Sequence, residues 1–313
     1  MMYHHNLMFA DASHPYDDAN FVIMGVGFDR TSTYRTGQRF GPNAVREATW
    51  NFETWLFEHL VDMKDIKIHD LGNLDEAGKV EDMLAHVAEV SKKVLDDGKF
   101  LITLGGEHSI SPGIVRHFGK PDKLSAAARK HLFGKEKLAS SDGIGVLVVD
   151  AHLDGKEEHL GDKWSHACAS RRMADAVGAD HLVVIGVRSI ARYEFDEAKK
   201  SGLRFISSFD VKRDGIEASV KRALEMIGRE RIYLSIDIDG VDPAFAPGVA
   251  TPEPFGLTPD DLKKLVNAVG DRLIGADIME LTPYLDPSAI TAGLVARIAR
   301  EIIAVKWKTG RGK

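Results

Sequence analysis

Three short segments, far apart in the chain, each place metal-binding side chains after an apolar run. They are residues 105–108, 150–154 and 237–239. The second and third segments follow β-rich stretches that we interpret as buried parallel strands. Open parallel sheets carry their active sites at the carboxyl ends of the strands, so we expect these side chains to meet there. The candidate ligands are His108, Asp150, His152, Asp154, Asp237 and Asp239.

The charges of this set indicate what it binds. Four aspartates cannot share a low-dielectric crevice without compensation, and two divalent cations would cancel their charge. A water held between two such ions loses a proton near neutral pH, which favours hydrolysis. Aspartate and histidine without cysteine suit Mn²⁺ best, although Co²⁺, Ni²⁺, Fe²⁺ and Zn²⁺ also fit. An isolated Asp-x-Asp is usually a turn or a helix cap, but three such segments together favour a binuclear site.

The same segments resemble the three metal signatures of the ureohydrolase family, which includes arginases and agmatinases. The matching motifs are Gly-Gly-Glu-His-Ser, Asp-Ala-His-Leu-Asp and Ser-Ile-Asp-Ile-Asp-Gly-Val-Asp-Pro, and the likeness runs from about Phe21 to the last helix. The resemblance implies two Mn²⁺ per subunit, bridged by Asp150 and Asp237. The implied ligands are His108, Asp150, Asp154 and Asp237 for one ion, and His152, Asp150, Asp237 and Asp239 for the other.

The resemblance also implies catalytic roles. Asp154 would hydrogen-bond the metal-bridging hydroxide and take up its proton during attack on a guanidinium carbon. Glu280, in Gly-Ala-Asp-Ile-Met-Glu-Leu-Thr-Pro, stands where the family has a glutamate that forms a paired hydrogen bond to the guanidinium. His166 stands where the family has a histidine that moves protons at the pocket mouth or contacts substrate. Urea and a primary amine would be the products.

The expected substrate is a small cationic guanidino compound. Residues 28–42 resemble the amino-terminal signature of agmatinases, and residues 251–256 carry the Thr-Pro-Glu typical of that branch, with Glu253 where arginases usually have an apolar residue. The loop at 155–162 lacks the Asn and Ser arrangement with which arginases bind the amino-acid end of arginine, and its acidic residues suit a terminal amine. We therefore expect hydrolysis of agmatine to putrescine and urea, a step of polyamine biosynthesis.

Other hypotheses stay open on sequence alone. Guanidinobutyrase, formimidoylglutamase and arginase use the same metal chemistry, and Lys156, Lys163 or Arg171 could bind an anionic substrate end. A metal-dependent deacetylase with one metal would not require both histidines together with four aspartates. A non-catalytic family member would keep the ligands without turnover. Residues that depart from the family pattern around the pocket are Leu153, Gly155, Ala167, Cys168 and Phe255.

Length and composition exclude several classes of protein. The 313 residues carry a formal charge of −6 and no long basic run, which argues against nucleic-acid binding. No segment reaches the roughly 18 consecutive apolar residues that a membrane helix requires, so we expect no membrane partner. One cysteine excludes an internal disulfide framework, and nothing at the amino terminus resembles a secretory signal, so we expect a cytoplasmic protein. The family resemblance suggests a homo-oligomer, a trimer or a hexamer.

Apolar β-type runs alternate with amphipathic stretches, the pattern of a mostly parallel sheet covered by helices on both faces. We expect a single-domain, three-layer α/β fold like that of arginase over residues 1–313, with an amino-terminal extension at 1–20 and a helical surface insertion at 119–141. Helices are predicted at 42–59 and 80–97. Strands are predicted at 21–27, 100–104, 145–149, 181–185, 204–206, 231–236 and 272–279.

Overall fold

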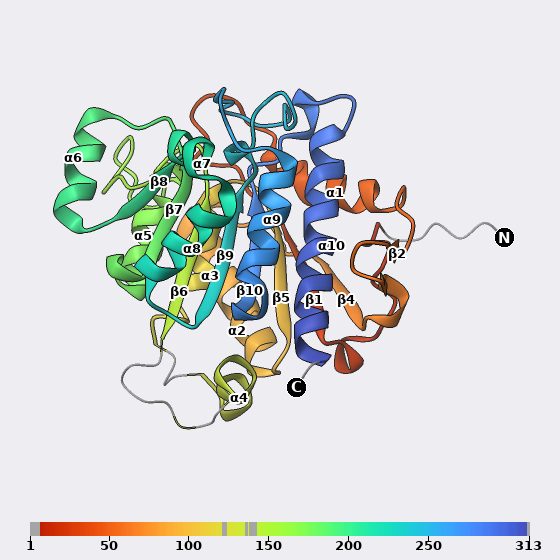
Figure 1. The fold of residues 1–313 in the computed structure, drawn as a ribbon. Helices are drawn as coiled ribbons and strands as arrows, with labels where there is room; N and C mark the ends of the chain where they lie inside the picture. Colours follow the sequence, from red (N-terminus) through yellow and green to blue (C-terminus); the bar gives the residue numbers. More distant parts are fainter. Residues whose placement is uncertain (1–6, 121–123, 135–136, 138–142, 312–313) are drawn as a thin grey trace.

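An eight-stranded sheet forms the centre of the protein in a computed structural model that describes residues 7–120, 124–134, 137 and 143–311 (Figure 1). Its strands are β1 (Phe21–Val26), β4 (Ile68–Asn73), β5 (Phe100–Gly105), β6 (Ile144–Val149), β7 (Leu182–Val187), β8 (Arg204–Ser207), β9 (Arg231–Asp237) and β10 (Leu273–Met279). The strand order is β4-β1-β5-β10-β9-β6-β7-β8, and each neighbouring pair is parallel.

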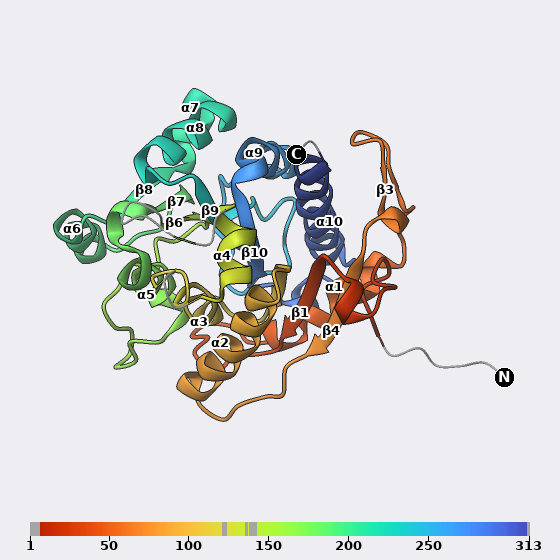
Figure 2. The same cartoon turned by 90° about the horizontal axis from the view of Figure 1, so that it is seen from below.

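Helices cover both faces of this sheet, which makes three layers, as Figures 1 and 2 show. One face carries α1 (Gly41–Thr49), α7 (Ser208–Asp214), α8 (Ile216–Ile227), α9 (Pro259–Val269) and α10 (Ile290–Arg311). The opposite face carries α2 (Val80–Asp96), α3 (Ser111–Val115), α4 (Ala126–Phe133) and α5 (Ala169–Val177). Helix α6 (Arg192–Ser201) lies beyond the β8 edge. The predicted three-layer α/β fold is confirmed.

Side-chain alternation along the strands divides the apolar core into two clusters, one on each face of the sheet. In β1, Phe21 and Ile23 belong to the cluster that contains the buried side chains of α10, whereas Val22 and Met24 belong to the cluster that contains those of α2. Both faces of the strands are therefore buried. This explains why the strands appear in the sequence as nearly continuous apolar runs.

The seven predicted strands form, with each boundary within two residues of the prediction. The edge strand β4 was not predicted, because one of its buried positions carries a charged residue where an apolar residue would be expected. Asp70 of β4 is buried, and its two carboxylate oxygens accept hydrogen bonds of 2.8 Å from Nε and Nη2 of Arg46 in α1. A buried carboxylate requires such a partner, which periodicity cannot reveal.

The predicted helix at 80–97 is confirmed as α2, but the predicted helix at 42–59 is wrong in its second half. Helix α1 ends at Thr49, and a short antiparallel hairpin of β2 (Trp55–Leu56) and β3 (Val61–Asp62) follows. Thr49 Oγ1 accepts a hydrogen bond from the backbone N–H of Ala10. The amino-terminal segment therefore packs at the end of the helix, a contact that local sequence does not show.

The predicted insertion at 119–141 is helical in part. Helix α4 begins after Ser125, whose Oγ accepts a hydrogen bond from Ala128 N–H, and ends before Gly134, which has a φ of 71°. Ala128 is fully buried, so one side of α4 packs against the apolar core. Of the two predicted peripheral segments, residues 1–6, 121–123, 135–136 and 138–141 lie outside the described residues.

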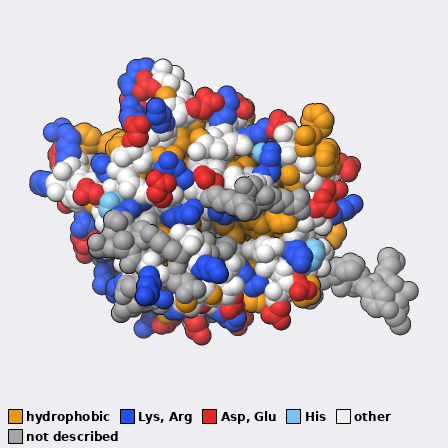
Figure 3. All heavy atoms as spheres, turned by 60° about the horizontal axis from the view of Figure 1, so that its bottom comes forward, with side chains coloured by type: hydrophobic (Ala, Val, Ile, Leu, Met, Phe, Trp, Pro, Cys, Tyr) orange, Lys and Arg blue, Asp and Glu red, His pale blue; other side chains and the backbone are white. Residues whose placement is uncertain are grey.

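The surface gives no sign of one dominant charge on the face shown in Figure 3, where acidic and basic side chains are interspersed. Hydrophobic side chains gather on that face near the β2–β3 hairpin, which exposes Phe57 and Leu60. Within the described ranges, every helix is too short or too polar to cross a bilayer.

Candidate metal centre and substrate pocket

The predicted site residues follow four neighbouring strands of the sheet, β5, β10, β9 and β6. The ends of these strands are in register, since Ile278 of β10 pairs with both Leu104 of β5 and Ile236 of β9. The register places the residues after each strand at one edge of the sheet. They are His108 after β5, Glu280 after β10, Asp237 at the end of β9 and Asp150 after β6.

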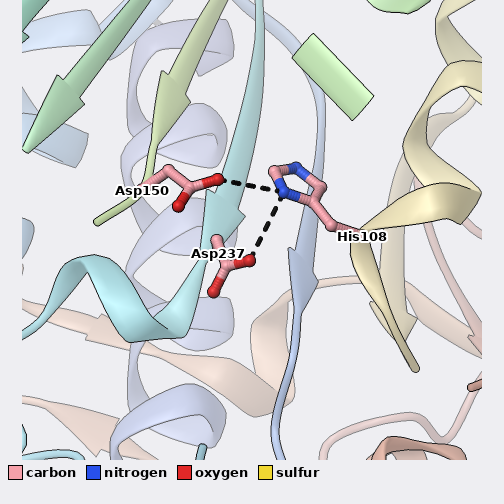
Figure 4. Close-up of side chains that lie close together, drawn as sticks. All are labelled: His108, Asp150 and Asp237. Atoms are coloured by element: carbon pink, nitrogen blue, oxygen red, sulfur yellow. Dashed lines mark ion pairs between the residues drawn. The ribbon is translucent and has the colours of Figure 1, made fainter. Parts of the chain in front are cut away.

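The first ligand group surrounds the imidazole of His108 (Figure 4). Its Nδ1 lies 3.2 Å from Asp150 Oδ2, 3.3 Å from Asp154 Oδ2 and 3.4 Å from Asp237 Oδ2. One ligand atom each from His108, Asp150 and Asp237 lies within 4.8 Å of the other two. These side chains come from three different strand ends and converge on one point, as ligands of a single ion would.

The second ligand group surrounds His152. Its Nδ1 lies 3.1 Å from Asp239 Oδ2 and 3.5 Å from Asp150 Oδ1. Asp150 therefore presents one oxygen to each group, Oδ2 to His108 and Oδ1 to His152. A carboxylate with this arrangement can bridge two metal ions.

The hydrogen bonds of His108 leave its Nδ1 available to a cation. Ser235 Oγ donates its hydrogen to Asp277 Oδ1 at 2.7 Å, so it accepts from the Nε2–H of His108 at 3.0 Å. The Nδ1 of a neutral His108 then carries no hydrogen. Nδ1 and Asp150 Oδ2 are both buried without a hydrogen-bond partner. Two buried, unpartnered ligand atoms that face each other fit a metal ion between them.

The electrostatics of the cluster lead to the same conclusion. Burial raises the pKa values of Asp150 and Asp237 above the usual range of a carboxyl group, and repulsion from neighbouring carboxylates adds to it, chiefly from Asp154 for Asp150 and from Asp239 for Asp237. Burial by itself would lower the pKa of His108, but its contacts with the surrounding carboxylates outweigh burial and raise that pKa. The cluster therefore favours bound positive charge, which two divalent cations would supply.

The structure brings all six predicted ligands together. Asp154 reaches the first group from a backbone with a φ of 49°, a left-handed conformation that Asp tolerates better than most residues. Asp237 turns Oδ2 toward His108, whereas its Oδ1 accepts a hydrogen bond of 2.9 Å from Asp239 N–H. Bridging of the two groups by Asp237 stays a prediction.

Glu280 is held beside the first ligand group by hydrogen bonds to both of its carboxylate oxygens. Oε1 accepts from His108 N–H at 2.7 Å, and Oε2 accepts from Gln38 Nε2 at 2.9 Å. The backbone of Glu280 has a φ of 69°, and the residue is buried. Burial raises its pKa to about 7, and the neighbouring Glu107 contributes in the same direction. The carboxylate is thus fixed in orientation and only partly solvated.

A pocket of about 470 Å³ lies over the two ligand groups, a volume suited to a small molecule. Glu280 and His166 line this pocket together with metal-ligand candidates from both groups. Its walls also include residues outside the predicted set. These are Thr33, Lys156, His159, Ala167, Ser189, Ile190, Ala191, Glu194 and Thr251.

Glu253 lies at the margin of the second group, with Oε1 4.0 Å from His152 Nε2. Arg188 Nη2 donates to the Glu253 carbonyl at 2.7 Å and to the Asp239 carbonyl at 2.8 Å. Arg188 therefore ties the segment that carries Glu253 to the segment that carries the candidate ligand Asp239.

The loop at 155–162 lines the pocket with Lys156 and His159. Glu157 of this loop is exposed and turns instead toward Arg171 and Arg172, each 3.0 Å away. The acidic character of the loop is therefore partly neutralised outside the pocket.

Several residues of the site were missed by sequence analysis. Glu107 directly precedes a predicted ligand, and Thr31 lies in the signature at 28–42, so both had a signal that went unused. Glu194 had none, because it lies on an amphipathic helix and only the fold turns it inward, where it accepts a hydrogen bond from Gly155 N–H at 2.9 Å. Cys168 is buried, and burial raises its pKa to about 12, so it is no nucleophile at neutral pH.

Comparisons with known proteins agree with this geometry. Residues 19–304 match the model of the arginase family. The chain is 31% identical to an agmatinase of Bacillus anthracis, over 93% of both chains, and 33% identical to an agmatinase of Citrobacter koseri, over 93% of this chain and 89% of the relative.

Solved structures agree as well. The agmatine ureohydrolase of Thermoplasma volcanium superposes with a TM-score of 0.87 at 35% identity, over 99% of this chain and 97% of that one. A formiminoglutamase of Trypanosoma cruzi shares the fold, with a TM-score of 0.79 at 20% identity over 95% of both chains. The matching family model, the curated relatives and the shared fold establish that this chain belongs to the arginase family of metal-dependent hydrolases.

Proposed function

We propose that the protein is an agmatinase, which hydrolyses agmatine to putrescine and urea. One observation carries this proposal: the carboxylate of Glu280 lines the same pocket as both ligand groups. A planar guanidinium matches a carboxylate in shape and charge, so Glu280 can hold the guanidinium carbon beside the metal centre. The agmatinases of B. anthracis and C. koseri and the agmatine ureohydrolase of T. volcanium support this choice of substrate.

Two Mn²⁺ per subunit are the proposed cofactors. Six oxygen and nitrogen donors without sulfur suit this ion, and the structure of the T. cruzi relative is described with Mn²⁺. Bound ions would supply an activated water by lowering its pKa to near neutrality.

The residues of the chain divide the remaining work. Glu280 orients the guanidinium and balances its positive charge. Asp154, which belongs to the first group and lines the pocket, takes up the proton that the attacking water loses. His166, which lines the pocket, delivers a proton to the departing amine, which would otherwise be a poor leaving group. The C–N bond then breaks to release the two products.

The far end of the substrate carries a primary ammonium, and two carboxylates of the pocket region suit it. Glu253 lies beside the second ligand group, and Glu194 lines the pocket wall with its carboxylate buried. Lys156 and His159 line the same pocket, so an anionic tail is the specific alternative, as in a guanidinobutyrase. Arginase and formimidoylglutamase activities are further outcomes that the test must separate.

The test is product release by the purified, Mn²⁺-loaded protein with agmatine, arginine, 4-guanidinobutyrate and formimidoylglutamate. We expect the highest kcat/KM for urea release with agmatine. Preferential urea release from arginine or 4-guanidinobutyrate, or formamide from formimidoylglutamate, would refute the proposed substrate while keeping the metal chemistry. Two bound metals without any product would indicate a non-catalytic role. We further propose that the protein is a cytoplasmic homo-oligomer. Light scattering of the purified protein tests the oligomeric state, and cell fractionation tests the location.

A further inference from the structure

A buried carboxylate next to the metal centre has hydrogen-bond donors gathered around it. Glu107 is fully buried and precedes the ligand His108, but its own carboxylate faces the segment after β1. Oε1 accepts from Thr31 Oγ1 at 2.7 Å and from Ser109 Oγ at 2.6 Å, while Oε2 accepts from Thr31 N–H at 2.9 Å and from Ser32 Oγ at 3.0 Å. No step of the proposed reaction uses these contacts.

Thr31 connects this carboxylate to His166. Its Oγ1 accepts the backbone N–H of His166 at 2.9 Å and lies 3.2 Å from His166 Nδ1. A hydroxyl has one hydrogen, and the shorter contact to a carboxylate, at 2.7 Å, takes it. Thr31 Oγ1 can then serve Nδ1 only as an acceptor, so Nδ1 carries a hydrogen. Ser165 Oγ, at 3.4 Å from the same nitrogen, is a weaker competitor.

We propose that Thr31 and Glu107 are positioning residues that hold the neutral His166 ring in its Nδ1–H tautomer and leave Nε2 as the nitrogen that exchanges protons in the pocket. Two contacts from one side chain, to the backbone and to the ring, fix both the place and the orientation of the imidazole. The ring of His159 packs edge-on to it, with centroids 6.2 Å apart. The arrangement is a hydroxyl-mediated counterpart of a carboxylate that orients a catalytic histidine.

The proposal deepens the proposed function and rests on it for its catalytic consequence. When the C–N bond of the intermediate breaks, the N–H bond of the product amine forms at the expense of the Nε2–H bond of a protonated His166. The ring is left neutral with its hydrogen on Nδ1, which is the form that Thr31 stabilises. The ring need not turn before it takes up the next proton at Nε2.

The tautomer is tested directly by ¹⁵N NMR of the histidine rings in the full-length protein loaded with diamagnetic Zn²⁺, with His166→Asn to identify the signals. Wild type should show a protonated Nδ1 and an unprotonated Nε2 at alkaline pH. Thr31→Val removes the hydroxyl at nearly constant shape, and its His166 should shift toward Nε2–H or a mixture. Thr31→Ser keeps the hydroxyl and should retain the wild-type pattern. Ser32→Ala removes a donor to Glu107 but no contact to His166, and should also retain it.

Kinetics test the consequence. For Thr31→Val we expect kcat for urea release to fall by at least about tenfold, because general acid catalysis contributes about 10²–10⁴-fold in rate. KM and metal content should change less than about twofold, and Thr31→Ser should restore most of kcat. A purely structural role would instead lower stability and metal content together and would not move the tautomer.

The two proposals can fail separately. If agmatine is not a substrate, the kinetic comparison uses the substrate found, and the NMR result still decides on Thr31. A wild-type spectrum with Nε2–H, or a Thr31→Val protein with unchanged Nδ1–H, overturns the positioning role. If Thr31→Val does not fold, the wild-type and Thr31→Ser spectra alone decide it.

Discussion

Removal of the Ser235 hydroxyl should weaken metal binding through His108. Ser235 Oγ stands between His108 Nε2, at 3.0 Å, and Asp277 Oδ1, at 2.7 Å, and all three residues are fully buried. In Ser235→Ala the imidazole loses the acceptor that fixes its tautomer, and burial leaves little room for water to replace it. Such partners of metal-bound histidines contribute about 10- to 100-fold to metal affinity. The expected loss is therefore about 1.4–2.8 kcal/mol of binding free energy.

The assay is competition with a chelator of known affinity, which gives dissociation constants for both equivalents of Mn²⁺. We expect Ser235→Ala to weaken one equivalent by about 10- to 100-fold and to leave the other, held through His152, within about threefold. Tyr233→Phe is the matched control, because it removes the hydrogen bond of 2.8 Å to Asp277 Oδ2 and leaves Ser235 in contact with His108. Unchanged affinities in Ser235→Ala, or an equal loss in Tyr233→Phe, would show that the reasoning is incorrect.

Three further predictions concern single residues. Asp154→Asn should lower urea production by about 10²–10⁴-fold while part of the metal stays bound, and unchanged urea release in a coupled assay would exclude its proton-transfer role. Asp70→Asn leaves Arg46 buried without its bidentate partner, so urea denaturation should show a loss of about 3–5 kcal/mol, whereas Asp196→Asn in an exposed pair should change little. Because the pKa of Cys168 is raised to about 12, the folded protein at pH 8 should resist iodoacetamide and the denatured protein should react; rapid labelling of the folded protein would contradict this.

The candidate metal ligands could be predicted from sequence because the chemistry and the strand signals coincide. Asp150 directly follows an apolar run, and Asp237 ends another. Parallel strands direct residues at these positions to one edge of a sheet. His152 and Asp154 could be predicted beside Asp150 because side chains two positions apart point to the same side of an extended chain. These inferences need no knowledge of which strands are neighbours.

Long-range contacts explain what the sequence left unpredicted. Strand β4 was not predicted because its buried Asp70 depends on an ion pair with Arg46 of α1. Helix α1 was predicted too long because the contact of Ala10, in the amino-terminal segment, with the end of this helix is not visible in the local sequence. In the site, Thr31 lies 135 positions from His166, so no local pattern joins the two. A hydrogen bond between such residues exists only when the chain has folded.

The sequence by itself determined the candidate ligand set, the strands that carry it and the need to balance its negative charge, because residue type and periodicity are local properties of the chain. The tertiary structure decided how these residues are used. The register of β5, β10, β9 and β6 sets the distances between ligands, and burial raises the pKa of Glu280 to about 7. Hydrogen bonds from distant segments orient His108 and His166. Distance, burial and orientation depend on which segments pack together, and packing is a property of the whole fold.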